Sequence, residues 1–362
     1  MVVLSGGSHT ELAKQVCDRL GVRLGDKTTV SRPNHEILMD VRESVRGKHV
    51  FIIQTVSKEL NKDVMELLIT IYACKTSSAH NVTVVLPYLP YGTQCRLRRR
   101  SALPCKLLAD MICNAGADRL ITMDLYRKEI QGFFSVPVDN LRASPFLLRY
   151  IEENIADYRN AVIVAWSPRA TDKASSYAER LRLGIAVIHG ERKADDDSAG
   201  AAESRDDSPM PGADVPGASA AAVVTTGSFT EAVRYFPLPT AKEKPPLTVV
   251  GDVNCKIAIM VVDIIDSAAP FVEAAEELRQ RGAYKIYLLA THAVLSGDAP
   301  QLLAKSEIDE LVVTNTVPHE VQKLQCHKIK TVDISLILSE AIRRIQNGES
   351  ISFLFRDVSL AD

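Results

Sequence analysis

The stretch Ile257-Ala-Ile-Met-Val-Val-Asp-Ile-Ile-Asp-Ser-Ala-Ala-Pro-Phe271 indicates the fold of this 362-residue chain most directly. Its first six residues are an apolar, β-branched run, which is typical of a strand buried on both faces of a sheet. Two acids, Asp263 and Asp266, and a short loop follow, and helical spacing then begins at Pro270. A strand, a loop and a helix in this order predict one unit of an α/β fold with parallel strands.

Similar runs occur along the rest of the chain. Apolar runs predict further strands at 49–54, 82–86, 119–123, 161–165, 184–188, 285–289 and 310–314. Segments with helical spacing lie between or after them, at 64–73, 105–112 and 335–347. Because the alternation continues through both halves, we expect an α/β fold with mostly parallel sheets in two stacked, Rossmann-like domains.

The composition excludes several classes of protein. Lys and Arg number 43 and Asp and Glu number 45, so the net charge of −2 argues against a nucleic-acid-binding protein. No apolar run reaches the roughly 18 residues that a membrane-spanning helix needs, and the first residues do not resemble a signal peptide. Seven scattered cysteines without a CxxC pair indicate free thiols in a reducing compartment. We therefore expect a cytoplasmic protein that binds neither membrane nor nucleic acid.

One segment departs from this pattern. Residues 193–246 are rich in Ala, Asp, Ser, Gly and Pro and poor in large apolar side chains. Such a composition cannot bury enough surface to offset the entropy lost on ordering, so we predict a disordered insertion within the second domain.

The motifs outside this insertion resemble those of the ribose-phosphate pyrophosphokinase family. The matching blocks are NHE at 34–36, ESVRG at 43–47, PYGTQ at 90–94, MDLYRKEIQGFFSVPVDN at 123–140, VIHGERK at 187–193, VVDIIDSA at 261–268 and DISLILSEAIRRIQNGESISFLF at 333–355. The long insertion and the shortened loop after Pro168 are most similar to the phosphoribosyl pyrophosphate synthetase-associated branch, which the resemblance implies to be non-catalytic. It also implies phosphoribosyltransferase-like domains at 1–145 and 146–345, with residues 346–362 returning to the first.

The reaction of the active family members transfers a diphosphate from ATP to ribose 5-phosphate, and it depends on positioning and on positive charge. Positions that the resemblance assigns to this chemistry are altered here, at Tyr126, Arg169, Gly190 and Val262. Matching positions that remain are Arg192, Asp263 and Asp266, with Lys193 nearby. Since the loss of one cation can slow such a transfer on the order of a hundredfold, we expect no efficient catalysis.

Binding positions of the family are partly retained. By resemblance, Asp124 and Asp139 are the remaining metal ligands, which implies weak Mg²⁺ coordination and no required cofactor. Asn34, Glu36 and Gln94 match nucleotide-binding positions. A regulatory site for phosphate or ADP at a subunit interface is implied by Ser44, Arg46, Gln131, Asp139, Asn140, Ser350 and Ser352.

The resemblance therefore predicts a regulatory, inhibitory subunit that self-associates and co-assembles with catalytic ribose-phosphate pyrophosphokinase subunits. Two alternatives stay open. The chain could be a divergent, active diphosphokinase that uses Arg192, Lys193, Asp263 and Asp266. It could also be a nucleotide-sensing scaffold that recruits partners through the insertion.

Overall fold

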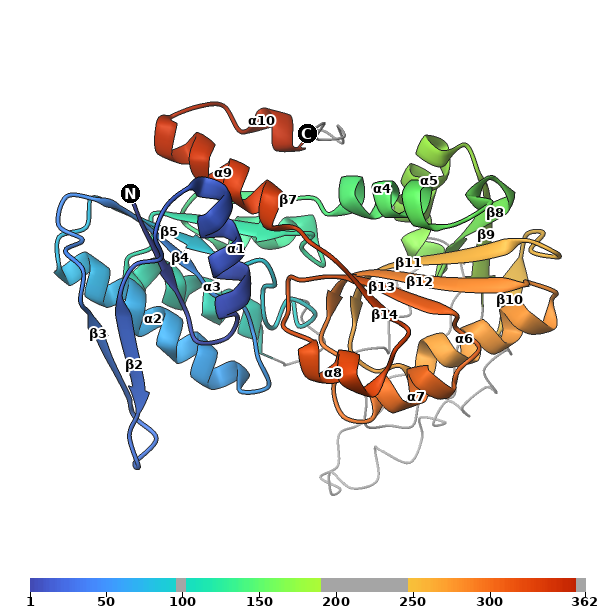
Figure 1. Ribbon diagram of the computed structural model, residues 1–362, viewed down its shortest axis with the longest axis horizontal. Helices are drawn as coiled ribbons and strands as arrows, with labels where there is room; N and C mark the ends of the chain where they lie inside the picture. The colour runs from blue at the N-terminus through green and yellow to red at the C-terminus, as the bar shows by residue number, and fades with distance from the viewer. Residues whose placement is uncertain (96–101, 190–246, 356–362) are drawn as a thin grey trace, which may run out of the picture. The chain divides into compact units, whose positions relative to one another are not determined.

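The structure is a computed structural model that describes residues 1–95, 102–189 and 247–355 (Figure 1). The predicted insertion at 193–246 lies outside these residues, as do Gly190 and Arg192. The described chain contains two mostly parallel sheets with helices on their faces, so the predicted α/β fold is confirmed.

The first sheet is parallel throughout. Among the described residues its order is β1-β4-β5-β6-β7. The strands are β1 (Val2–Ser5), β4 (His49–Ile53), β5 (Asn81–Val85), β6 (Arg119–Met123) and β7 (Val138–Leu141). A separate antiparallel hairpin is formed by β2 (Lys27–Ser31) and β3 (Ile37–Val41). The three central strands of the sheet were predicted from their apolar runs. Strands β1 and β7 were not, because their four residues are too short to show a periodic pattern.

Helices cover both faces of this sheet. On one face, Leu67 of α2 (Leu60–Thr76) and Leu108 of α3 (Pro104–Ala115) share a core with Val50 and Ile52. On the other face, α1 (Thr10–Leu20) and α9 (Ser335–Asn347) pack on Phe51 and Ile53. The alternation of residues 50–53 between the two cores follows from the period of two of a strand.

The C-terminal elements pack on the first sheet. Ile334, residues of α9, and Leu354 of α10 (Ser352–Phe355) all belong to the core on the α1 side. In Figure 1, α9 runs beside α1. The return to the first sheet thus includes residues from 334 onward, whereas we expected it from 346. The division of the chain into domains at 145 and 345 stays a prediction.

The second sheet has the order β10-β9-β8-β11-β12-β13-β14 in the described part of the chain, and only the pairing of β10 with β9 is antiparallel. Its strands are β8 (Ala161–Ala165), β9 (Gly184–His189), β10 (Thr248–Val250), β11 (Ile257–Ile265), β12 (Lys285–Ala293), β13 (Glu310–Thr314) and β14 (Ile329–Val332). The accompanying helices are α4 (Ser144–Asn154), α5 (Thr171–Leu181), α6 (Ala269–Gln280), α7 (Ala299–Lys305) and α8 (Glu320–Gln325).

The central strand β11 is longer than its apolar run. Ile264 and Ile265 still pair with His292 and Ala293 of β12, so the ladder continues past Val262. Asp263 therefore lies within the strand, and the expectation that it follows the strand was wrong. Asp266 is the first residue after β11.

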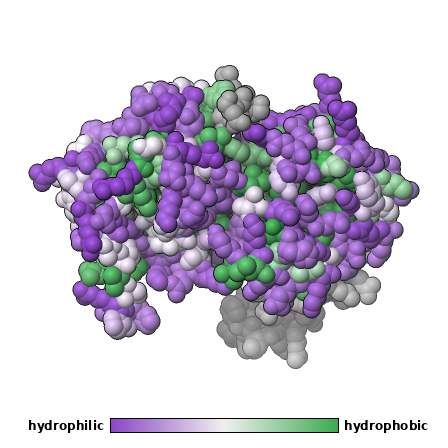
Figure 2. Space-filling view, in the orientation of Figure 1, coloured by the Kyte–Doolittle hydropathy of each residue, from purple (hydrophilic) through white to green (hydrophobic). Residues whose placement is uncertain are grey.

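The surface agrees with the composition. Figure 2 shows a face on which hydrophilic side chains predominate and hydrophobic ones form separate patches. Among the described residues, no helix combines the length and the apolar character needed to cross a bilayer. All seven cysteines lie in the described ranges and are free thiols, as expected.

Candidate functional site

The candidate site lies where the carboxyl end of β6 meets β11 and β12. Asp124, the first residue after β6, has a positive φ of 39°. Its Oδ2 accepts hydrogen bonds from the Ala143 N–H at 3.2 Å and from the Thr291 hydroxyl of β12 at 2.8 Å. Asp124 thus connects the two sheets, and its carboxylate is held by donors from both.

His292 makes a second connection between the sheets. Its Nε2 lies 3.1 Å from the carbonyl oxygen of Met123, at the end of β6, and its Nδ1 lies 2.9 Å from the hydroxyl of Thr316. Because a carbonyl can only accept, Nε2 carries the proton and Nδ1 accepts. Burial lowers the pKa of His292, so the ring is neutral at pH 7 and acts here as a structural bridge.

Lys173, in the first turn of α5, contacts the middle strand of the second sheet. Its ammonium forms an ion pair with Asp263 and also lies 3.4 Å from the carbonyl oxygen of Val262. Burial by itself lowers the pKa of Lys173, but the carboxylates of Asp263 and Asp124 outweigh it and raise this pKa above the usual value. Lys173 is therefore charged, and it neutralises Asp263 from within the chain.

Tyr126 lines a small pocket beside these contacts. The other lining residues are Tyr88, Leu89, Gly92, Met123, Asp124, Leu125, Ile264 and His292. The Arg127 guanidinium lies over the Tyr126 ring, 5.8 Å from its centroid. Burial, followed by the charge of Asp266, raises the pKa of Tyr88 to about 12, so this phenol does not ionise near neutral pH.

The structure brings together several of the predicted catalytic positions. Tyr126 and Asp124 share the pocket with β11, the strand that carries Val262 and Asp263. The Asp266 carboxylate accepts a hydrogen bond from the Ser296 N–H at 3.2 Å. Arg169 lies in the short helical turn Pro168–Ala170, and its side chain is outside the description. Gly190 and Arg192 are outside it altogether.

The two predicted metal ligands are occupied by other contacts. Asp139 accepts from the Arg119 guanidinium at 2.8 Å, and Asp124 accepts from Ala143 and Thr291. Within the described ranges no three His, Cys, Asp or Glu side chains are grouped to hold a metal ion. Mg²⁺ usually takes one or two carboxylates and completes its octahedral shell with water and phosphate oxygens, so Mg²⁺ binding by Asp124 and Asp139 stays a prediction.

The predicted nucleotide-binding residues lie on two separate loops. Asn34 and Glu36 are at the exposed tip of the β2–β3 hairpin, where the Asn34 side chain accepts from the Glu36 N–H at 3.1 Å. Gln94 is an exposed residue in the turn that begins at Tyr91. Nucleotide binding by these three residues stays a prediction.

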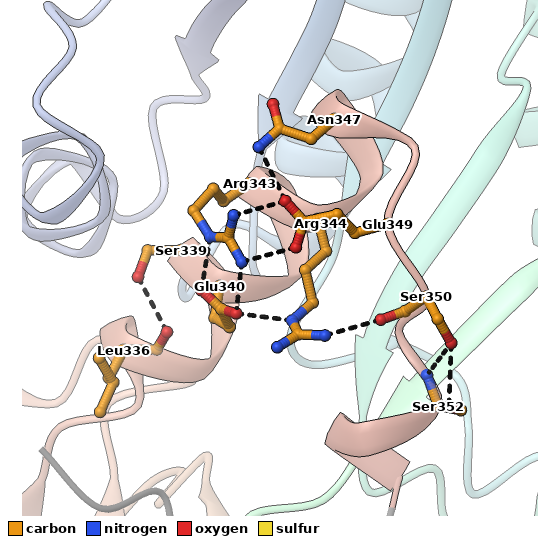
Figure 3. Close-up of polar contacts among 9 residues, drawn as sticks. All are labelled: Leu336, Ser339, Glu340, Arg343, Arg344, Asn347, Glu349, Ser350 and Ser352. Atoms are coloured by element: carbon orange, nitrogen blue, oxygen red, sulfur yellow. Dashed lines mark hydrogen bonds and ion pairs between the residues drawn. The ribbon is translucent and has the colours of Figure 1, made fainter.

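A dense polar cluster surrounds Ser350 and Ser352, two of the predicted regulatory residues (Figure 3). Their hydroxyls lie 2.9 Å apart, and the Arg344 guanidinium donates to the Ser350 carbonyl at 2.8 Å. Arg343, and then Arg344, lower the pKa of Glu340 to about 2. The cluster fixes the turn from α9 into α10 and holds the two serines side by side.

The other predicted regulatory residues are distributed over the first sheet. Helix α10 lies against β7, which carries Asp139 and Asn140. The Asn140 side chain accepts from the Leu125 N–H at 3.2 Å, and the Gln131 amide donates to the Lys128 carbonyl at 3.1 Å. Ser44 and Arg46 are exposed on a different loop, before β4, on either side of the buried Val45. An interface pocket formed by these residues stays a prediction.

Three residues of the site, Lys173, Thr291 and His292, were not predicted from the sequence. Their partners lie 90, 167 and 169 positions away along the chain, at Asp263, Asp124 and Met123. No local spacing signals such contacts. The one indication in the sequence is their place, in the first turn of a helix or near the carboxyl end of a predicted strand.

Comparison with known proteins gives the site its context. Residues 157–356 match the family described as phosphoribosyl synthetase-associated domain, and residues 1–116 match the N-terminal domain of ribose phosphate pyrophosphokinase. The chain is 58% identical to phosphoribosyl pyrophosphate synthase-associated protein 2 of Homo sapiens, over 99% of this chain and 93% of that protein. It is 57% identical to associated protein 1 of Homo sapiens, over 99% and 96%.

A solved structure shows the same fold. The crystal structure of phosphoribosylpyrophosphate synthetase from Mycobacterium smegmatis is similar to this one with a TM-score of 0.78 and 31% identity, and the match covers 96% of this chain and 99% of that one.

Proposed function

The chain belongs to the phosphoribosyl pyrophosphate synthase-associated protein family, and on this premise we propose that it is a non-catalytic regulatory subunit of a phosphoribosyl pyrophosphate synthase. It would assemble with catalytic subunits and with other copies of itself. In that complex it would inhibit the formation of phosphoribosyl pyrophosphate, the precursor made for nucleotide synthesis.

The observation that carries this proposal is the likeness to the associated proteins over 99% of the chain. The state of the candidate site supports the same role. A diphosphate transfer needs metal and cationic groups around the phosphates, whereas here the nearest carboxylates are bound by Lys173, Thr291 and Arg119. Carboxylates held by these partners are less available to a metal ion and its bound phosphates, in line with the proposed lack of efficient turnover.

The regulatory residues extend the proposal. Ser350 and Ser352 present two neighbouring hydroxyls, and Ser44 and Arg46 are exposed at another part of the surface. Hydroxyls and guanidinium groups are suitable ligands for phosphate or the diphosphate of ADP. We therefore include phosphate or ADP binding, at an interface with another subunit, in the proposed function.

A paired assay tests the proposal. The purified chain is assayed for product formation from ATP and ribose 5-phosphate, alone and then mixed with a catalytic synthase of the same source, while light scattering records the mass of the complex. We expect no turnover alone, and a mixed complex with a lower rate per catalytic subunit. Robust Mg²⁺-dependent turnover by the chain alone, or no mixed complex, would refute it.

A matched variant separates the activity of the chain from that of a co-purifying synthase. Asp263→Asn with Asp266→Asn keeps the shapes of both side chains and removes both charges from the end of β11. If the chain itself were the enzyme, as in the alternative above, this variant would lose the turnover. Turnover that is the same in both preparations comes from a contaminant.

A further inference from the structure

The ion pair between Lys173 and Asp263 lies near the carboxyl end of β11, the central strand of the second sheet. Asp263 is in the last part of β11, and Lys173 reaches it from α5 over a separation of 90 residues. The lysine side chain is 23% exposed and that of the aspartate 36%, so the pair is only partly open to solvent. The ammonium also lies within 3.4 Å of the Val262 carbonyl.

A carboxylate at the carboxyl end of a parallel strand is the usual place to hold a sugar hydroxyl or a divalent cation. Lys173 takes one of these oxygens, Oδ1 of Asp263, which a divalent cation or a sugar hydroxyl could otherwise use. Here Lys173 brings a full positive charge to Asp263, and a second charge would have to displace it or lie beside it against Coulomb repulsion. The neighbouring Asp124 is committed as well, to Thr291 and Ala143.

We propose that Lys173 is an internal cation that keeps a divalent cation and a pentose phosphate out of this site. The inference rests on the proposed function and deepens it. Besides the changed residues around the site, one residue that fills the site would account for the loss of ligand binding. Lys173 is thus a specificity-determining residue, and removing its charge returns the Asp263 carboxylate to solvent and to ligands.

The test is a binding measurement on the isolated full chain. Isothermal titration calorimetry with ribose 5-phosphate in the presence of MgCl₂ is carried out on the unaltered chain, on Lys173→Met and on Lys173→Gln. Methionine keeps much of the length of the side chain without its charge, and glutamine serves if methionine impairs folding. Circular dichroism checks that each variant is folded.

The matched control is Lys256→Met. Lys256 also pairs with an aspartate, Asp252, at 2.8 Å, but on the surface before β11. The substitution Lys256→Met removes one positive charge just before β11 and leaves the site unaltered. The control therefore reports any effect of net charge on binding.

We expect the Lys173 variants to bind at least about tenfold more tightly than the unaltered chain and Lys256→Met, a difference of about 1.4 kcal/mol. Equal binding by all chains, including no binding by any of them, would overturn the inference. Weaker binding by the Lys173 variants would overturn it too, because Lys173 would then be a ligand for the phosphate. None of these results depends on a synthase partner, so failure here is distinct from failure of the paired assay.

Discussion

Replacing Glu66 by glutamine tests how strongly a buried charge holds helix α2 to the hairpin and the loop beside it. The residue is 4% exposed on α2, and its carboxylate receives the Lys27 ammonium at 2.7 Å and the Thr29 hydroxyl at 3.0 Å. The Gly7 N–H, in the loop after β1, donates to both of its oxygens, at 3.1 and 3.2 Å. One side chain thus joins α2, the β2–β3 hairpin and the β1–α1 loop.

The expected cost follows from what Glu66→Gln leaves behind. Glutamine has one accepting oxygen, while Lys27 keeps a charge on a side chain that is only 6% exposed. Removing one partner of a buried ion pair costs about 3–5 kcal/mol, a large share of the roughly 5–15 kcal/mol that stabilises a typical domain. We expect a value near 3 kcal/mol because the amide oxygen still accepts one hydrogen bond.

Urea unfolding followed by circular dichroism at pH 7 measures this loss. Glu59→Gln is the matched control, since Glu59 precedes the same helix and pairs with Lys62 at the surface, where we expect no measurable change. Adding Lys27→Met to the Glu66 variant should recover part of the loss, because it removes the unpaired charge. A loss below about 1 kcal/mol for Glu66→Gln would refute the reasoning.

The pH dependence of this contact has a defined sign. Burial alone raises the pKa of Glu66, but Lys27, the Gly7 N–H and Thr29 outweigh it and hold the pKa below its ordinary value. A carboxylate with a lowered pKa in the folded state stabilises above its unfolded pKa, and this stability is lost as the pH falls through the folded value. The stability difference between the unaltered chain and Glu66→Gln should therefore shrink in acid.

Two further predictions concern other parts of the structure. Burial lowers the pKa of His9, His292 and His319 below the ordinary 6.5, so the unfolded chain binds protons at a higher pH than the folded chain does. The midpoint of urea unfolding should therefore be lower at pH 5.5 than at pH 7.5. An equal or higher midpoint at pH 5.5 would contradict this. In Gly6→Ala, the new Cβ would lie 1.4 Å from Oε1 of the buried Gln54 and would displace that side chain. Thermal unfolding should show a free energy of unfolding lower by about 2 kcal/mol. Gly132→Ala is the control, because its Cβ would have no atom within 4 Å, and we expect no loss of stability there.

Much of the fold could be read from local patterns. The predicted strands at 119–123, 161–165 and 310–314 have the same bounds as β6, β8 and β13, and the helix predicted at 335–347 is α9. These elements have strong apolar runs or clear helical spacing, and such patterns depend only on residues close together in the sequence. The hairpin strands β2 and β3 were missed because their polar, partly exposed residues give no such run.

The candidate site could be predicted only as a set of positions. Resemblance named Tyr126, Val262 and Asp263, and the structure places all of them around the ends of β6 and β11. The resemblance did not indicate that the Asp139 carboxylate is paired with Arg119. Nor could the resemblance show that α10, which begins at Ser352, packs against β7, which carries Asp139 and Asn140. Whether these groups meet depends on contacts beyond a single element.

The sequence by itself determined the alternation of the central strands with helices, because burial on both faces of a parallel sheet requires apolar runs that are visible in any short window. Only the tertiary structure decided which charges and hydrogen-bonding groups meet at the ends of those strands. Lys173 meets Asp263, and His292 meets Met123, across 90 and 169 residues. Such pairings follow from how the chain packs in three dimensions, and that packing brings together residues whose separation along the chain carries no periodic signal.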